Sequence, residues 1–407
     1  MLMGAEHWIW LQQVLGYSNK AIKPVIEIFG SAEAFFDYCK GNNNVKAPLS
    51  KAQIDRVHKI KADNIYHIAA ECERHGIEII PYTDTRYPER IKSLSNPPAL
   101  LYVKGSLMDI DGECAVTMVG PREASEYGLK AAFSLSRRLA YAGCLIVSGG
   151  AKGIDGMAHK GALSVERPTV AVLGCGINHD YPKGNAKLRE QIAQNGCLIS
   201  EYPPDFRPSK TTYPSRNRIL SAISCGTVVV EAGAKSGALI TAGYAADQGR
   251  DVFVIPGNPS LPQYEGSNRL LKDGAKPVLT AADILEEYYP IFLQKIDLEA
   301  AAKVKSSSSD YERVVLQEEP KEKKAKPKRP AQADIKTENR PADKKTAPDG
   351  LGKEAALIYG GVRSEIFTVD EAVQVSGLDA GEALSALTEL EIFGLITQIP
   401  GGRYKFL

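Results

Sequence analysis

Strands, glycine turns and helices alternate in residues 115–176, which read AVTMVGPREASEYGLKAAFSLSRRLAYAGCLIVSGGAKGIDGMAHKGALSVERPTVAVLGCG. Three short apolar runs of this stretch lie at 115–119, 145–148 and 169–173. They are apolar on both faces, as the central strands of a parallel sheet must be. The segments between them, 127–142 and 155–163, are long enough for right-handed helical crossovers. The stretch therefore predicts successive βαβ units.

The same alternation continues to about residue 298. Further strands are expected at 198–200, 227–230 and 252–255, and further helices at 185–195, 215–224 and 238–248. Residues 77–298 are thus predicted to form an α/β domain with a Rossmann-like, doubly wound parallel sheet. Helices should cover both faces of that sheet.

The two ends of the chain have different patterns. Residues 1–76 show apolar residues at helical spacing, interrupted by glycine and proline, and predict a small helical domain of the SAM-like type. Because the segment lacks a hairpin glycine pair, we expect it to pack against the rest of the protein rather than to bind DNA. Residues 299–350 are rich in Ser, Lys, Glu, Pro and Ala, which predicts a flexible charged linker.

Residues 351–407 predict a winged-helix domain, with helices near 353, 369–375 and 380–393 and a hairpin around Pro400-Gly401-Gly402. The domain carries four basic and eight acidic residues. Its acidic charge favours a protein-docking module over a reader of duplex DNA. In the preceding linker, the tract 321–329 holds six basic residues and one acidic residue, which is more often a solvated tract than a DNA contact.

Composition limits the function classes. The chain has 407 residues, with 50 Lys and Arg against 49 Asp and Glu, so any basic surface must be local. Seven cysteines without a C-x-x-C pair suit a reducing compartment. Without a basic leader or a long apolar run, we expect a cytoplasmic protein with no membrane insertion.

Three glycine turns should meet at the carboxyl edge of the sheet, where open α/β folds bind ligands. They are Gly120-Pro121-Arg122, residues 148–155, and Gly174-Cys175-Gly176. Such turns let backbone N–H groups approach a phosphate. None completes the dinucleotide pattern G-x-G-x-x-G. In the last turn, Gly174 and Gly176 match the first two glycines, but His179 stands where the third glycine should be. One such turn alone would indicate only tight packing of a strand and a helix.

A cationic and aromatic cluster around residues 210–218 adds to these turns. Arg216 and Arg218 can donate forked hydrogen bonds to phosphate, with Asn217 between them, and Lys210 adds a mobile charge. The ring of Tyr213 can stack on a base. The alternative is a structural network of arginine and asparagine with Glu231, and both interpretations can hold together.

Six motifs resemble those of the DNA-processing protein A (DprA/Smf) family, in order and in spacing. They are MVGPREASEYG, SGGAKGIDGMAHKGAL, VLGCGINHDYPKGNAKL, YPSRNRILSAIS, VVVEAGAKSGALITA and VFVIPGNP. The resemblance implies a homodimeric single-stranded DNA-binding protein that protects incoming DNA during natural transformation in competent cells. It also implies a recombination mediator that loads the RecA recombinase, with no catalysis. We expect no cofactor and no metal.

The resemblance also implies site residues. Arg122 matches a phosphate-binding arginine, although Pro121 replaces the serine before it and removes a hydroxyl and a backbone donor. Gly149, Gly150 and Lys152 match a glycine-rich loop. Lys210 and Tyr213 match a basic position and an aromatic position, where tyrosine replaces a frequent phenylalanine and keeps the ring face.

The sequence leaves three alternatives open. A Rossmann-like nucleotide phosphoribohydrolase would share the glycine turns, Gly226-Thr227 and Glu231, but the run P-G-G-x-G-T-x-x-E is absent. A duplex-specific regulator would act through the winged helix, against its acidic charge. Asp155 and His159 have the spacing of a metal or acid–base pair, but more often such a pair caps and packs a helix start.

Overall fold

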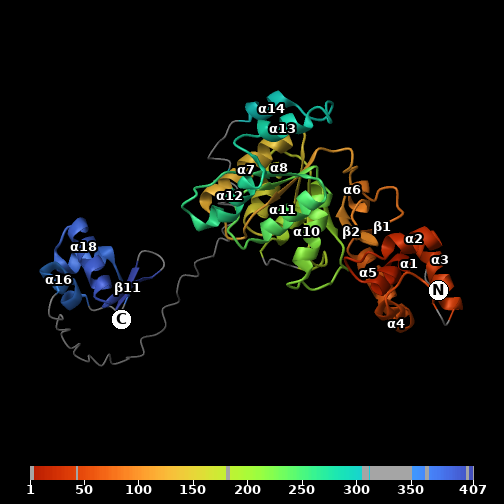
Figure 1. Ribbon diagram of the computed structural model, residues 1–407, viewed down its shortest axis with the longest axis horizontal. Helices are drawn as coiled ribbons and strands as arrows, with labels where there is room; N and C mark the ends of the chain where they lie inside the picture. The colour runs from red at the N-terminus through yellow and green to blue at the C-terminus, as the bar shows by residue number, and fades with distance from the viewer. Residues whose placement is uncertain are drawn as a thin grey trace, which may run out of the picture. The chain divides into compact units, whose positions relative to one another are not determined.

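The computed structural model describes residues 4–42, 45–179, 184–304, 311, 351–362, 366–399 and 403–406. The chain divides into two compact units, Met1–Pro320 and Lys321–Leu407, which are described separately (Figure 1). Most of the predicted linker, including the basic tract 321–329, lies outside the described residues. Within the described ranges, no helix is long and apolar enough to cross a membrane.

The first unit is built on a nine-stranded sheet with the order β1-β2-β6-β5-β4-β3-β7-β8-β9. Its strands are β1 (Ile77–Pro81), β2 (Leu100–Gly105), β3 (Ala115–Val119), β4 (Leu145–Ser148), β5 (Thr169–Leu173), β6 (Cys197–Ser200), β7 (Gly226–Val229), β8 (Asp251–Val254) and β9 (Lys276–Pro277). The strands from β6 to β9 across the sheet pair in parallel, whereas β2 runs antiparallel to β1 and to β6. The Rossmann-like parallel sheet is therefore confirmed, and each of the six predicted strands lies within one residue of its predicted position.

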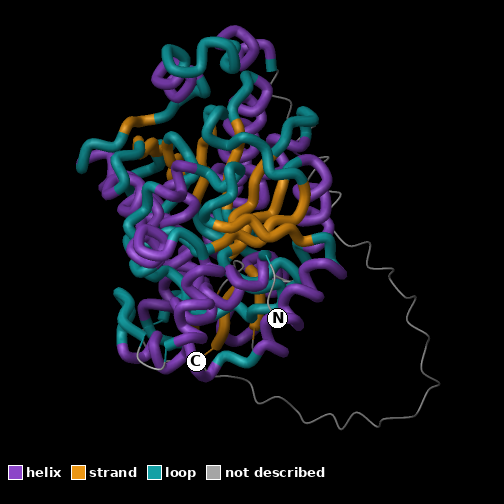
Figure 2. The backbone as a smooth tube through the Cα atoms, turned by 90° about the vertical axis from the view of Figure 1, so that its right-hand side faces the viewer, coloured by secondary structure: helices purple, strands orange, loops and turns teal. Residues whose placement is uncertain are grey.

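Helices cover both faces of the sheet, as the views in Figures 1 and 2 show. One face carries α7 (Glu126–Tyr141), α8 (Ile154–Leu163), α9 (Ala186–Asn195), α13 (Ala282–Tyr288) and α14 (Leu298–Lys303). The other face carries α6 (Glu89–Lys92), α10 (Thr212–Ala222), α11 (Gly237–Asp247) and α12 (Glu265–Lys272), with a short 3-10 helix, η1 (Pro262–Tyr264), before α12.

Strand β3 shows why the two layers form. Val116 and Met118 are buried against α7 and α8, whereas Ala115 lies in the core of the opposite face. Thr117, also on that opposite face, donates a hydrogen bond from its hydroxyl to the carbonyl of Leu220 in α10, 2.7 Å away. Alternation along one strand thus supplies a surface for a helix on each side.

The linker begins later than the sequence predicted. Residues 298–303, assigned from 299 onward to the linker, form helix α14. The carboxylate of Asp297 caps this helix by accepting hydrogen bonds from the N–H groups of Glu299 and Ala300, both at 3.0 Å. Ala301 is buried in the same core as α7. A good cap and a small apolar face are enough to extend the folded unit past residue 298.

The N-terminal helices share a hydrophobic core with the sheet. These helices are α1 (Ala5–Leu15), α2 (Ile22–Phe29), α3 (Ala32–Gly41), α4 (Lys51–Lys59) and α5 (Ala62–Arg74). Leu11 and Val14 of α1 belong to one buried cluster with Tyr102, Leu173 and Leu198 of the sheet. Residue 76 therefore marks a change of secondary structure but no break in the core.

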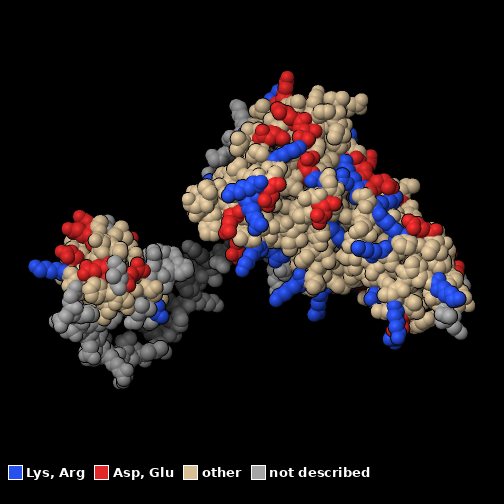
Figure 3. Space-filling view, viewed as in Figure 1, with Lys and Arg blue, Asp and Glu red and all other residues tan. Residues whose placement is uncertain are grey.

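The second unit is a winged helix, as predicted. It contains α16 (Lys353–Gly361), β10 (Ile366–Thr368), α17 (Val369–Ser376), α18 (Ala380–Ile392), β11 (Ile396–Ile399) and β12 (Arg403–Phe406), with strand order β10-β12-β11. Acidic side chains lie on its visible face (Figure 3). Two acidic residues of this unit, Glu371 and Glu382, complete capping boxes with Thr368 and Asp379 at the starts of α17 and α18.

Candidate nucleic-acid interface

The sheet reverses its winding at β3. From β3 the chain proceeds through β4, β5 and β6 on one side, and it then returns through α10 to form β7 on the other side. Ligands of open α/β sheets bind outside the carboxyl ends of the strands at such a switch point. The turns that follow β3, β4 and β5 meet at this edge, which is where the sequence predicted them.

The turns after β3 and β4 lie directly on each other. Gly153 has φ +74, and a Cβ atom there would lie 2.3 Å from the carbonyl oxygen of Pro121 and 2.5 Å from that of Arg122. The N–H of Ile154 donates to the Pro121 oxygen at 3.3 Å. This close approach requires a glycine, and it leaves the side chains of Arg122 and Lys152 exposed at the edge.

Arg216 lies beneath these turns. It is 5% exposed and donates to the backbone oxygens of Gly149, at 2.9 Å, and of Val172. Burial lowers the pKa of Arg216, and the charge of Asp155 opposes that effect. Burial likewise raises the pKa of Asp155, opposed by Arg216. The guanidinium thus fastens the turn after β4 to β5, which corrects the prediction that it faces phosphate.

The ring of Tyr213 packs among the turns at the start of α10. The guanidinium carbon of Arg122 lies 4.9 Å from the ring centroid, and that of Arg216 lies 5.8 Å from it. A Cβ atom on Gly174 would come within 2.8 Å of the ring, so the turn after β5 closes one side. Tyr213 and Asn217 are half-buried, and Lys210 is exposed on the loop that enters α10.

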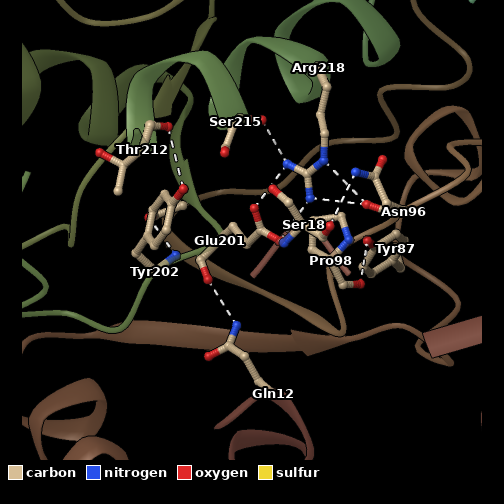
Figure 4. A network of polar contacts seen from close by, with 11 residues as sticks. Gln12, Ser18, Tyr87, Asn96, Pro98, Glu201, Tyr202, Thr212, Ser215 and Arg218 are labelled. Atoms are coloured by element: carbon tan, nitrogen blue, oxygen red, sulfur yellow. Dashed lines mark hydrogen bonds and ion pairs between the residues drawn. The ribbon is translucent and has the colours of Figure 1, made fainter. Parts of the chain in front are cut away.

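Arg218 is buried away from the glycine turns, and this corrects the prediction that it binds phosphate. Its side chain is 3% exposed and pairs with the equally buried Glu201, with N–O distances of 2.8 and 2.9 Å (Figure 4). Residues two apart on a helix do not share a face, so Arg216 and Arg218 cannot both point to one ligand. Glu231, the partner considered for these arginines, instead accepts a hydrogen bond from the Ser125 hydroxyl at 2.7 Å.

Asp155 and His159 pack the start of α8, in keeping with the packing interpretation. Asp155 accepts a hydrogen bond from the Ala151 N–H at 3.3 Å. Nδ1 of His159 lies 2.8 Å from the hydroxyl oxygen of Thr169, whose own proton goes to the carbonyl of Ile146. Complete burial lowers the pKa of His159 to about 3, so the imidazole is neutral.

Two exposed cations near this edge were not singled out from the sequence. Arg207 lies on the same loop as Lys210, and Lys235 lies on the loop that follows β7 at the switch point. The position of Lys235 after a predicted strand was a usable signal. No sequence motif around Arg207 predicts its position, because the path of the loop 201–211 depends on contacts with other parts of the fold.

Comparison with known proteins adds a family to this geometry. Residues 78–289 match the family described as DNA recombination-mediator protein A, and residues 342–402 match the DprA winged helix domain. DNA processing protein DprA of Bacillus subtilis is 36% identical over 245 residues, which are 60% of this chain and 81% of that protein.

Two solved structures resemble the chain. The X-ray structure of DNA processing protein A from Streptococcus pneumoniae matches with a TM-score of 0.61 and 32% identity, over 70% of this chain and 99% of that one. A structure of DNA processing protein A from Helicobacter pylori, which concerns a single-stranded DNA binding mode, matches with a TM-score of 0.48 and 31% identity, over 54% of this chain and 97% of that one. The family match includes every parallel strand of the sheet, and a second family match covers most of the winged helix, so the chain belongs to the DNA-processing protein A (DprA/Smf) family.

Proposed function

We propose that the carboxyl edge of the sheet binds single-stranded DNA, and that the protein is a recombination mediator. The observation that carries the proposal is the contact of the exposed Arg122 with the half-buried ring of Tyr213 at the switch point of the sheet. Exposed Lys152 and Lys210 lie on the neighbouring loops. Proteins that bind single-stranded nucleic acid use cations that contact its phosphate backbone and aromatic rings on which its bases stack.

The combination favours single strands over duplex DNA. An aromatic ring set among turns can stack only on a base that is free of its own stack, and a duplex does not offer one at low cost. The buried Arg216 fixes the turns in advance, so the site need not be rebuilt when a strand binds. Pro121 removes one backbone donor of the turn after β3, which leaves the phosphate contact there to Arg122.

Membership of the family supports the wider role. We propose that the protein protects incoming single strands in natural transformation, acts as a homodimer and transfers the strand to the RecA recombinase. Light scattering at micromolar concentration should give the mass of a dimer, and a monomer with and without DNA would count against this part. Faster RecA filament formation on coated single strands would support the transfer.

The winged helix is better suited to a protein partner than to DNA. Its acidic residues at the starts of α17 and α18 would repel phosphate, and an α18 with Glu382 exposed is a poor reader of a major groove. We propose that this unit docks a protein with a basic surface.

A competition experiment with the full chain tests the proposal. A labelled oligothymidine should be displaced by unlabelled single strands and much less by a blunt duplex of equal nucleotide content. Equal displacement by the duplex would refute single-strand preference. Incubation with nucleoside monophosphates should release no free base, and release would favour the phosphoribohydrolase alternative.

A further inference from the structure

The loop 201–211 connects β6 to α10 and carries two exposed cations, Arg207 and Lys210. One side of this loop rests on the turn after β5. The N–H of Gly176 donates to the carbonyl of Phe206 at 2.9 Å, and the N–H of Asn178 donates to that of Pro204 at 2.9 Å. These contacts hold the middle of the loop at the carboxyl edge of the sheet.

The other side of the loop rests on the N-terminal helices. The ring of Tyr17, in the turn between α1 and α2, lies 4.8 Å from the ring of Tyr202 and 5.1 Å from that of Phe206. Tyr202 and Phe206 stack on each other at 4.9 Å. Three rings therefore join a turn near the N-terminus to the loop that leads to Lys210 and Tyr213.

Glu201 links the same turn to α10. It is 2% exposed, and its carboxylate accepts a hydrogen bond from the N–H of Ser18 at 2.9 Å while it pairs with Arg218 (Figure 4). Its backbone oxygen accepts from the side chain of Gln12 at 2.8 Å. Arg218 in turn donates to the carbonyl of Asn96 at 3.0 Å. One buried carboxylate thus connects α1, the turn after it and α10.

The backbone of Ser18 shows that this connection is specific. Ser18 has φ 54, a left-handed conformation that costs free energy in any residue with a Cβ atom. Such a conformation persists where the surroundings determine it, and here it directs the Ser18 N–H to Glu201. The turn is therefore shaped to meet the loop.

We infer that the turn Tyr17–Ser18 is a positioning element of the single-strand interface. Through Glu201, Tyr202 and Phe206 it holds the loop 201–211 and the start of α10, and so it sets where Lys210 and Tyr213 meet the strand. The inference rests on the proposed function. It also requires reciprocity: if the turn raises affinity for DNA, bound DNA must stabilise the turn by the same factor.

The test compares two identical substitutions in the full chain, Tyr17→Leu and Tyr38→Leu. Both tyrosines are half-buried, Tyr17 in the turn after α1 and Tyr38 in α3. The ring of Tyr38 packs on that of Phe29, 4.9 Å away, and its hydroxyl donates to the backbone carbonyl of Lys46, so these contacts stay within residues 1–76. Tyr17→Leu should weaken oligothymidine binding about tenfold, which corresponds to about 1.4 kcal/mol. Tyr38→Leu should leave the affinity nearly unchanged.

Hydrogen exchange distinguishes a positioning role from a general loss of folding stability, because a positioning role predicts a local change in the loop. Without DNA, Tyr17→Leu should speed exchange of backbone amides in 205–213, and Tyr38→Leu should not. In the wild type, oligothymidine should slow exchange in residues 16–19. Equal effects of the two substitutions on affinity and on exchange would overturn the inference.

Two further variants separate failure of this inference from failure of the proposed function. If Arg122→Ala and Lys210→Ala both leave oligothymidine affinity unchanged, the proposed interface is wrong. If they weaken binding while Tyr17→Leu changes neither affinity nor exchange in the loop, the interface stands and the positioning role is refuted.

Discussion

Arg122, Arg216 and Arg218 carry the same guanidinium group in three different environments. Arg122 is exposed at the edge of the sheet, Arg216 is buried under the glycine turns, and Arg218 is paired with Glu201. The sequence presents the last two as neighbours with one chemical role. On helix α10 the side chains of Arg216 and Arg218 point to different sides, because residues two apart on a helix do not share a face.

Whether an arginine is exposed or buried decides whether its substitution measures DNA binding or folding stability. Removing Arg218 would leave Glu201 as a buried, unpaired charge, which costs about 3–5 kcal/mol. A loss of DNA binding in such a variant would therefore report on folding. Arg122 and Lys210 are exposed, so their substitution reports on the interface itself.

His159 should make stability depend on pH. Its folded pKa is about 3, below the unfolded value near 6.5, so the unfolded state binds the proton first as the pH falls. Stability should therefore fall as the pH drops below about 6.5, by about 2 kcal/mol between pH 7 and pH 5. Thermal unfolding of the wild type at the two pH values measures the loss.

The variant His159→Asn isolates this effect. Its amide can still donate to the Thr169 hydroxyl oxygen but does not titrate. The raised pKa of Asp155 acts in the opposite direction, but it is present in both proteins, so the difference between them belongs to His159. An equally steep pH dependence in the variant would show that another group titrates.

The turn after β4 depends on a glycine at residue 153, which has a left-handed backbone and a close backbone neighbour. Gly153→Ala places a Cβ atom against the Pro121 and Arg122 carbonyls at a left-handed residue. We expect a loss of roughly 1–2 kcal/mol of stability from the backbone alone and a clear loss of affinity for oligothymidine.

Gly249→Ala is the matched control for this substitution. Gly249 has φ +67 but nothing within 4 Å of its Cβ position, and it lies in the turn before β8. This variant should lose similar backbone stability and keep its affinity. Denaturant unfolding and oligothymidine titration compare the two, and equal affinities would mean that the paired turns do not shape the interface.

Strands β3 to β8 could be predicted because each is a short apolar run separated from the next by a segment long enough for a helix, and β3, β4 and β5 are followed directly by glycine turns. Strands β1 and β2 were not specified, because an antiparallel hairpin at the edge of the sheet has no turn signal of that kind between 81 and 100. Strand β9 has two residues and no apolar run. Likewise the exposed Arg122, Lys152 and Lys210 follow from local motifs, whereas the pairing of Arg218 with Glu201 and the contact with Ser18 depend on tertiary packing.

In the whole molecule, the first unit should carry most of the affinity for DNA. Truncation after residue 304 keeps every described element of that unit except residue 311 and removes the acidic winged helix. At fixed salt the affinity for oligothymidine should change by no more than about threefold, with the loss coming from the basic tract 321–329. Loss of most of the affinity would place the main site in the removed part.

We propose that phosphate contacts and a stacking ring lie together at the carboxyl edge of the sheet. The most direct measurement is the affinity of the full chain for oligothymidine over a series of salt concentrations, for the wild type, Arg122→Ala, Lys210→Ala and Tyr213→Ala. Each lost phosphate contact should flatten the slope of log K against log salt by about 0.7 in the Arg122 and Lys210 variants.

Tyr213→Ala should instead cost roughly 1–3 kcal/mol at every salt concentration, because stacking on a ring releases no counterions. Tyr213→Phe should restore most of the affinity. A changed slope for Tyr213→Ala with unchanged slopes for the two cation variants would contradict the roles assigned here, and unchanged affinity in all three would place the DNA site elsewhere.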